Sequence, residues 1–235
     1  MRKEPYDVGS YVHVVKRGGR GLPIVRDDID KWRFLLSLLH ENDRFHSENW
    51  FRDLMDYKLA NTFTRPPIWP EHRPIVKILA FTLMPNHFHL LLKEIRKDGV
   101  SLFMEKVGKA MTHHSNKKNR EKGSLFQGPF RSRTVDSDAY LRYVAAYIMV
   151  KNVFELYPKG GLKKASENFN AAWKWAIQYP YSSLTDYSEK RACPIIDKDL
   201  LGEVIGSPIA LKNLGRDFIS GQKTDTALSE RVILE

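Results

Sequence analysis

The sequence is poor in cysteine, with Cys193 as its single thiol. One thiol cannot form an internal disulfide, and it cannot supply the ligands of a cysteine-rich zinc site. We therefore expect neither a disulfide-stabilised secreted scaffold nor a zinc ribbon. A reducing cytoplasm is the expected location.

Long apolar segments are also missing. No stretch approaches the roughly 18 uninterrupted apolar residues that a membrane-spanning helix requires, and the opening residues MRKEPYDVG lack the apolar core of a secretory signal. Hydrophobic residues make up 42% of the 235 residues and charged residues 28%, which is ordinary for a soluble globular protein. We expect one large domain, or one domain with an extension, and no membrane partner.

Acidic residues are scarce relative to basic ones. The chain has 28 Asp and Glu against 38 Lys and Arg, a net charge of +10. Such an excess is typical of proteins that bind a polyanion. Between residues 106 and 134, eight bases accompany one acid, Glu121, and the aromatic residues Phe126 and Phe130. A solvated helix face could explain part of this run, but a phosphate-contacting surface with stacking residues explains it better.

The stretch Lys77–Glu94, KILAFTLMPNHFHLLLKE, predicts two β-strands joined at residues 84–86. In the second strand the alternating apolar residues point to one face, and His87 and His89 point to the other. Two imidazoles at i and i+2 project in parallel, close enough to bind one cation. The spacing alone is weak evidence, because two partly buried histidines with hydrogen-bonded neighbours would look the same. The position at a sheet end, just after a Pro-Asn turn, favours the metal site.

The other patterns predict alternating strands and helices, which indicate an α+β fold with an antiparallel sheet backed by helices. The turn at residues 17–21 either brings backbone N–H groups against phosphate or is a flexible hairpin loop. The helix after Ser137 carries tyrosines at 140, 143 and 147 on one face, and core packing is expected for the first two. The predicted elements are a strand over Ser10–Lys16, a helix from Asp27 or Asp28 to Leu39, a short helix over 50–59, a helix over Val100–Asn119, an extended segment over Gly123–Val135, a helix from Ala139 to about Lys151, helical structure before Pro180, and short helices over Asp197–Ile205 and Ile209–Ser220.

Five ordered segments of the chain resemble IS200-like transposases, most closely the REP-associated tyrosine transposases. Together they extend from about Gly9 to Gly221. The segments are MPNHFHLLL, with its histidine–hydrophobe–histidine motif; YVHVVKRGGRGLPIVRDD at Tyr11–Asp28; GSLFQGPFRSRTV at Gly123–Val135; YLRYVAAYIMVKN at Tyr140–Asn152; and YPYSSLTD at Tyr179–Asp186.

This resemblance implies a ferredoxin-like antiparallel sheet backed by helices, with a helical C-terminal extension. The histidines would lie on the central sheet, with the tyrosine helix across them. We expect a catalytic domain over residues 1–160, with a probable insertion at 45–74, then the extension over 161–222 and a flexible tail over 223–235. The resemblance leaves monomer and homodimer both open.

The chemistry implied is transesterification of single-stranded or hairpin-bearing DNA through a 5′-phosphotyrosine intermediate. Tyr147 is the implied nucleophile, because Tyr147-Ile148 matches the family's YI, and we expect it at the surface. His87 and His89 would hold a divalent metal. Imidazole suits Mn²⁺ or Zn²⁺ better than Mg²⁺, so the expectation of Mg²⁺ or Mn²⁺ rests on the resemblance. The expected phosphate contacts are Arg17, Arg20, Lys117, Lys118, Arg131 and Arg133.

The chain departs from the family pattern beside the tyrosine. Relatives place Asn or Gln four residues after it, as the third metal ligand, but here Lys151 has that position and Asn152 follows. In a regular helix Lys151 lies roughly 40° from Tyr147 and Asn152 about 140° away, and a protonated lysine cannot bind a cation. Either a π-type bulge returns Asn152 to the histidines, or Lys151 meets the phosphate directly. We favour the bulge, with an i→i+5 hydrogen bond between Tyr147 and Asn152.

Two other classes of function share these features. One is a non-catalytic module, derived from such a transposase, that binds DNA or RNA hairpins through its basic face. The other is a zinc-dependent hydrolase that uses the same histidines. The second lacks a carboxylate partner close in sequence, since Glu71 and Glu94 lie outside the hairpin tip.

Overall fold

A four-stranded antiparallel sheet forms the centre of the protein. The structure, a computed structural model, describes residues 6–221 and 226–234. The sheet order is β2-β3-β1-β4, and every neighbouring pair is antiparallel. With a helix after β1 and another after β3, this is the split β-α-β order of a ferredoxin-like fold, so the predicted α+β class is confirmed. The strands are β1 (Tyr11–Arg17), β2 (Val76–Leu83), β3 (His87–Glu94) and β4 (Arg131–Val135).

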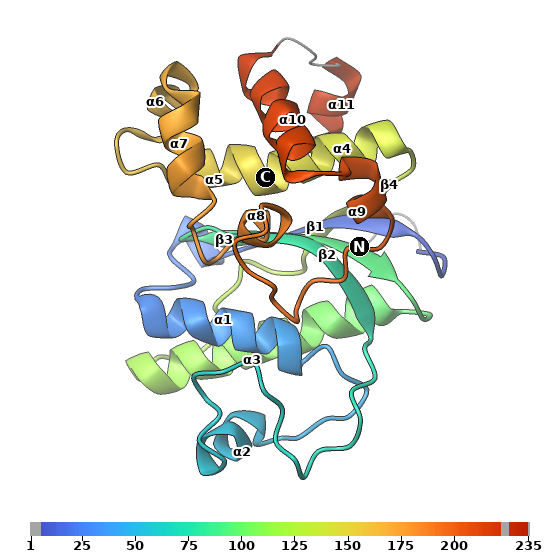
Figure 1. The fold of residues 1–235 in the computed structure, drawn as a ribbon. Coiled ribbons are helices and arrows are strands. Elements are labelled where there is room, and N and C mark those ends of the chain that lie inside the picture. Colours follow the sequence, from blue (N-terminus) through green and yellow to red (C-terminus); the bar gives the residue numbers. More distant parts are fainter. Residues whose placement is uncertain (1–5, 222–225, 235) are drawn as a thin grey trace.

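Two helices cover one face of the sheet (Figure 1), α1 (Asp28–His40) and α3 (Gly99–Asn119). The apolar side chains of β3 that alternate with its histidines face these helices and are fully buried there. Asp27 caps α1, since its carboxylate accepts from the Asp30 N–H at 3.0 Å. The predicted α1 and α3 are both confirmed.

The opposite face carries the tyrosine helix and the C-terminal layer (Figure 1). The predicted helix over Ala139–Lys151 divides into three parts: α4 (Asp138–Ala146), the π-helical turn η2 (Tyr147–Lys151) and α5 (Asn152–Glu155). The C-terminal layer consists of α6 (Gly161–Glu167), α7 (Phe169–Ala176), α8 (Leu184–Tyr187), α9 (Asp199–Ile205), α10 (Pro208–Ser220) and α11 (Thr226–Val232).

Part of the predicted flexible tail forms the helix α11, and the flexibility of the tail stays a prediction. Val232 and Leu234 are buried, 2% and 8% exposed, so apolar burial holds the segment against the tyrosine helix. The Tyr140 hydroxyl also donates to the carbonyl of Arg231 at 2.9 Å. Residues 223–225 and 235 of the predicted tail lie outside the described residues.

The predicted insertion at 45–74 adds a further layer below α1 and α3 (Figure 1). It contains the short helix α2 (Trp50–Asp56), within the predicted range. Trp50 and Leu54 of this helix form a small apolar cluster with Leu36 of α1. The insertion is therefore packed onto the domain and is not a free loop.

The segment after Tyr179 attaches the C-terminal layer to the edge strand β2. The Leu83 N–H donates to the carbonyl of Tyr181 at 2.9 Å, and the Ser183 N–H donates to the carbonyl of Phe81 at 2.9 Å. These bonds occupy backbone groups that an edge strand would otherwise leave unpaired. Within the described ranges, no helix is both long and apolar enough to cross a bilayer.

Candidate functional site

The centre of the candidate site is β3, where His87 and His89 face the tyrosine helix. Their ring centroids lie 4.9 Å apart, and both side chains are buried, 5% and 0% exposed. Leu91, two residues on, belongs to the core beneath α4 and η2, which confirms the predicted alternation of faces along this strand.

Each histidine has an orienting partner at the same ring nitrogen. Nδ1 of His87 lies 2.7 Å from Oδ1 of Asn86, and Nδ1 of His89 lies 3.1 Å from Nε2 of His13. Where Nδ1 donates the proton, Nε2 carries the lone pair that could bind a metal. With Nδ1 engaged in both rings, Nε2 of His87 and Nε2 of His89 are the candidate metal ligands.

His13 is a functional candidate that the sequence analysis missed. It lies on β1 opposite Leu91, two residue pairs away from the pair Val15 and His89, and its ring stacks on His89 with the centroids 5.3 Å apart. The sequence contains a signal for this residue, because strand alternation places His13 on the same face of β1 as Val15, which pairs with His89. What the sequence does not give is the pairing of β1 beside β3.

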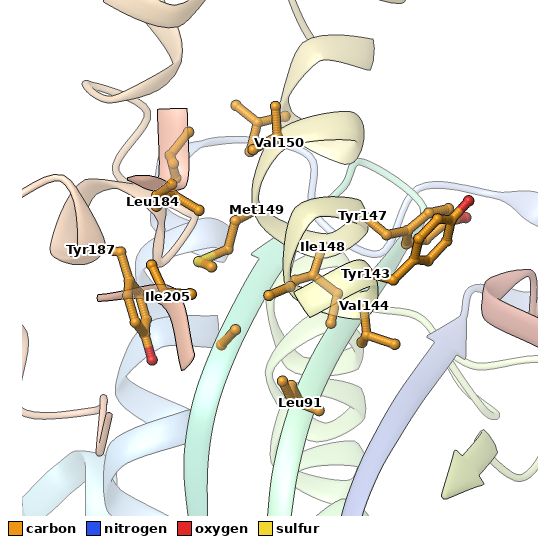
Figure 2. Close-up of a cluster of buried hydrophobic side chains, with 14 of the residues drawn as sticks. Leu91, Tyr143, Val144, Tyr147, Ile148, Met149, Val150, Leu184, Tyr187 and Ile205 are labelled. Carbon is orange, nitrogen blue, oxygen red and sulfur yellow. The ribbon is translucent and has the colours of Figure 1, made fainter. Parts of the chain in front are cut away.

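Tyr147 lies directly over these histidines. Its ring centroid is 5.5 Å from that of His89 and 6.1 Å from that of His13. In Figure 2, Tyr147 and Tyr143 project from the helix, while Ile148 points toward the sheet near Leu91. Sequence reasoning thus predicted a tyrosine that the fold does bring to the histidines.

The helix changes geometry at this tyrosine. The Asn152 N–H donates to the carbonyl of Tyr147, an i→i+5 bond, so the predicted π bulge is confirmed. The extra residue gives Asn152 the angular position that residue i+4 has in a regular helix. Asn152 is fully buried, and its amide oxygen and nitrogen have no hydrogen-bond partner among the described residues. The direction of this amide toward the histidines stays a prediction.

Lys151 lies beside the tyrosine. Its Nζ is 4.7 Å from the centroid of the Tyr147 ring and 2.6 Å from a carboxylate oxygen of Glu155. The ion pair holds the ammonium group in place, and the cation contacts the ring of the candidate nucleophile.

The expected surface position of Tyr147 is wrong. The residue is only 4% exposed. Phe218 of α10 covers this side, with ring centroids 6.5 Å from Tyr147 and 4.7 Å from Tyr143. Apolar burial against α10 outweighs exposure of the hydroxyl, because the C-terminal layer packs on the same helix face that carries the tyrosines.

Three of the six predicted phosphate contacts share the sheet face of the histidines. Arg17 pairs with His87, and the residues of β4 opposite Val15 and His13 are Arg131 and Arg133. Directly paired residues of an antiparallel sheet point to the same face. Arg131 also donates to the carbonyl of Leu234 at 3.2 Å.

The basic turn near Arg20 matches neither of its two interpretations. The Gly18 and Gly19 N–H groups donate to the carbonyls of Asn86 and Leu125 at 2.8 and 2.9 Å. A Cβ at Gly18 would lie 2.2 Å from the Leu22 carbonyl oxygen, so close packing fixes this turn. These backbone donors are occupied within the protein, and the exposed Arg20 side chain is what the turn offers to phosphate.

The last two predicted contacts, Lys117 and Lys118, lie on α3, on the other side of the sheet. Lys118 is engaged within the protein, because its Nζ lies 2.6 Å from carboxylate oxygens of both Asp27 and Asp30. Lys117 is exposed and forms no ion pair with the described residues. The structure therefore places Arg17, Arg131 and Arg133 on one side of the sheet and Lys117 and Lys118 on the other, with Arg20 in the turn after β1.

No cluster of three or more His, Cys, Asp or Glu side chains with metal-binding geometry occurs in the described part of the chain. A metal at this site would need a ligand of another type beside His87 and His89. The buried amide of Asn152 is of such a type, since its oxygen can bind Mg²⁺ or Mn²⁺. The donor set thus fits a divalent cation.

The chain was compared with family models, solved structures and curated proteins. Residues 71–151 match the family model "Transposase IS200 like", a range that contains both strand histidines and Tyr147 and ends just before Asn152. A solved structure of a REP-associated tyrosine transposase bound to a REP hairpin is similar over 83% of this chain and 88% of that chain, with 15% sequence identity and a TM-score of 0.45. The search of curated proteins found no match.

Proposed function

We propose that the chain cleaves and rejoins single-stranded DNA next to a hairpin, with Tyr147 as the nucleophile, because residues 71–151 match the IS200-like transposase family model. One observation carries the proposal. The ring of Tyr147 lies 5.5 Å from that of His89, on the sheet face that also holds His87. A hydroxyl nucleophile beside two oriented imidazoles is the arrangement that metal-assisted phosphoryl transfer requires.

The proposed reaction is a transesterification. Tyr147 Oη attacks the phosphorus and loses its proton, the new Oη–P bond forms, and the P–O3′ bond breaks. The 3′ oxygen leaves and takes up a proton, and the DNA stays joined to the protein as a 5′-phosphotyrosine. The phosphodiester bond energy is conserved, so the reverse attack by a 3′-OH rejoins DNA without ATP. Lys151 contacts the tyrosine ring and stabilises negative charge as the phenolate forms.

A divalent cation, Mg²⁺ or Mn²⁺, is proposed as the cofactor. His87 and His89 would hold it through Nε2, with Asn152 as the third ligand. When bound, such an ion neutralises the charge that accumulates on the phosphate oxygens. His13 and Asn86 are positioning residues, because they contact the ring nitrogen of each histidine that faces away from the proposed ligand atom.

Substrate access to Tyr147 is expected to involve the C-terminal layer. Tyr147 is 4% exposed and lies beside Phe218 of α10, so a DNA strand that approaches this tyrosine meets α10. Arg17, Arg131 and Arg133 share the same sheet face and would contact the phosphates of a strand that enters there.

The enclosed tyrosine also supports a second candidate function. A hairpin-binding module that no longer cleaves needs its basic surface, but it does not need an accessible nucleophile. The two functions differ in one product, the covalent protein–DNA adduct.

The test is an end-labelled hairpin oligonucleotide with single-stranded flanks, incubated with protein and Mn²⁺ and separated under denaturing conditions. We expect a covalent adduct with the wild type and none with Tyr147→Phe. The matched control is Tyr143→Phe, which removes the hydroxyl of a neighbouring tyrosine whose ring also packs on Phe218. His87→Ala and His89→Ala should abolish the adduct and retain hairpin binding, which rests on Lys and Arg. Binding without any adduct would favour the module, and cleavage without an adduct would indicate a hydrolase.

A further inference from the structure

A cavity of about 870 Å³ lies between the insertion helix α2, the end of α1 and the exposed side of α3. It is on the α1 and α3 side of the sheet, whereas Tyr147 is on the opposite side. The volume is in the range of small-molecule sites. The cavity is therefore a separate site from the one that holds Tyr147.

Arg33 lines this cavity and is 9% exposed. Its guanidinium carbon lies 3.4 Å from the ring centroid of Phe51 and 4.2 Å from that of Trp50. Burial lowers the pKa of Arg33 to about 10, so the side chain is still a cation at neutral pH. The two aromatic rings of the insertion fix this cation against one wall.

Two nitrogens of the Arg33 side chain are left without acceptors in the part of the chain that the structure describes. Its Nε and Nη1 are buried and have no hydrogen-bond partner among the described residues. Buried guanidinium donors without acceptors are costly. The nearby carboxylate of Glu41 lies 3.6 Å from Nζ of Lys106, and no ion pair with Arg33 occurs within the described residues. An anion in the cavity would be attracted to this cation and would accept from Nη2, the guanidinium nitrogen that is not among these enclosed atoms.

The cavity wall favours an anionic ligand. Its lining includes eight lysines and arginines and four acidic residues. Lys106 is the most enclosed of the lysines, with a side chain 12% exposed. Lys109 and Lys117 also line the cavity, and both belong to the part of α3 that lies in the basic stretch of residues 106–134. The cavity is thus continuous with a surface suited to phosphates.

The rim of the same cavity is apolar. Met55 and Leu102 line it and are 58% and 38% exposed, and Phe51 adds an aromatic ring. Exposed apolar side chains next to a buried cation suit a ligand with a flat ring at one end and an anion at the other.

We propose that this cavity binds a nucleotide, with its phosphate on Arg33 and Lys106 and its base against Phe51, Met55 and Leu102. The nucleotide is either a free nucleoside monophosphate or an unpaired nucleotide of a DNA strand that lies along α3. Both sources present the same phosphate and base. This site goes beyond the proposed strand cleavage and does not require it.

Photo-crosslinking tests the proposal with the wild-type protein, so it does not depend on the folding of a variant. The probes are 5-iodo-2′-deoxyuridine monophosphate and a hairpin oligonucleotide with 5-iodo-2′-deoxyuridine in its single-stranded flank. Trypsin releases residues 45–52, FHSENWFR, which contain both rings that pack on Arg33. We expect cross-links on this peptide. Labelling of this peptide by the free monophosphate indicates that the cavity binds a free nucleotide. Labelling by the oligonucleotide alone indicates that it binds an unpaired nucleotide of a DNA strand. Cross-links confined to other peptides with both probes overturn the proposal.

A second experiment tests the same proposal by substitution of Arg33. Arg33→Met keeps an unbranched apolar side chain against the two rings and removes the donors, so affinity for the labelling probe should fall by about tenfold or more. The matched control is Arg216→Met, because Arg216 also stacks on a phenylalanine ring, that of Phe169 at 5.1 Å, but in the C-terminal layer. A folded Arg33→Met protein with unchanged affinity contradicts the proposal, as does an equal loss in the control.

Discussion

The hydroxyl oxygen of Thr82 on β2 lies 2.7 Å from the carbonyl oxygen of Ile148, inside the π-helical turn. The same hydroxyl is 2.8 Å from Oγ of Ser182 and 2.9 Å from the carbonyl of Phe81. One hydroxyl has one proton to donate, and the shorter contact assigns it to Ile148. Ser182 can then donate to Thr82. The edge strand therefore holds the turn that carries the candidate nucleophile.

Replacement of Thr82 by Val should weaken this turn. The shape is kept, but the buried Ile148 carbonyl loses its side-chain donor, which costs about 1–3 kcal/mol of unfolding free energy. Urea denaturation measures the loss, and hydrogen exchange of the Asn152 amide should become faster. Thr185→Val is the matched control, because that hydroxyl donates to the carbonyl of Tyr179 at 2.9 Å, away from the π turn. Unchanged exchange at Asn152 would show that Thr82 does not support the bulge.

Deletion of Lys151 should preserve the proposed metal site. The deletion removes the extra residue of the π turn and makes Asn152 residue i+4 from Tyr147 in a regular helix, with both flanks in phase. We expect Mn²⁺ affinity within about threefold of wild type, whereas Asn152→Ala should lower it by at least about tenfold, as loss of a coordination-sphere group commonly does. Isothermal titration calorimetry with Mn²⁺ measures both. Lys151→Ala is the control that keeps the chain length. Unaltered Mn²⁺ binding by Asn152→Ala would exclude Asn152 as a ligand.

The two lysines at the end of α3 should differ in their effect on DNA binding. Lys117 is exposed, so Lys117→Ala should reduce the slope of log affinity against log salt by about one unit. Lys118 is held by Asp27 and Asp30, and its loss should destabilise the protein with little change of slope. Fluorescence anisotropy of a labelled hairpin at several salt concentrations measures both slopes. Equal reductions for the two variants would mean that the ion pairs open on binding.

Phe218 should control access to Tyr147. Phe218→Ala removes the ring that lies 6.5 Å from it, so enzymatic iodination of Tyr147 should become faster. Trypsin releases both tyrosines in residues 143–151, and fragmentation of this peptide in a mass spectrometer distinguishes them. Phe169→Ala is the control, because Phe169 packs on Phe154 and Trp173 in the same layer. Equal iodination rates in wild type and Phe218→Ala would show that another group limits access.

The sequence predicted most of the elements because their signals are local. The alternation in β3 placed His87 and His89 on one face, and Asp27 marked the start of α1. The first two inferences need nothing beyond neighbours along the chain. The π turn was predicted from the family resemblance, because relatives place Asn or Gln four residues after the tyrosine and Asn152 stands five residues after Tyr147.

What the sequence did not reveal depends on contacts between distant segments. His13 joins the site only because β1 pairs with β3. Tyr147 is enclosed because α10 packs across the helix, and amphipathic spacing in α10 does not say which surface it covers. The tail lacks a strong helical pattern, yet burial of Val232 and Leu234 orders it. The role of Arg33 likewise arises from a cavity that the insertion builds.

The attachment of α9 to the sheet should depend on pH through Asp199. Burial opposes ionisation of this carboxyl, but hydrogen bonds from Lys77, Tyr11, the Leu200 N–H and Lys93 outweigh it and hold the pKa of Asp199 well below its usual range. The Lys77 and Lys93 ammonium groups lie 2.8 and 3.0 Å from its oxygens. These contacts join the C-terminal layer to β2 and β3.

A carboxyl whose pKa is lowered in the folded state adds stability above its unfolded pKa of about 3.9, and that stability is lost as the pH falls toward the folded value. Asp199→Asn should therefore be much less stable than wild type at pH 7, and the difference should shrink between about pH 5 and pH 3. Urea denaturation across this range measures it. The control is Glu203→Gln, an exposed carboxyl on the same helix, whose stability should follow that of wild type. A difference for Asp199→Asn that stays constant down to pH 3 would show that its contribution does not come from the ionised carboxyl.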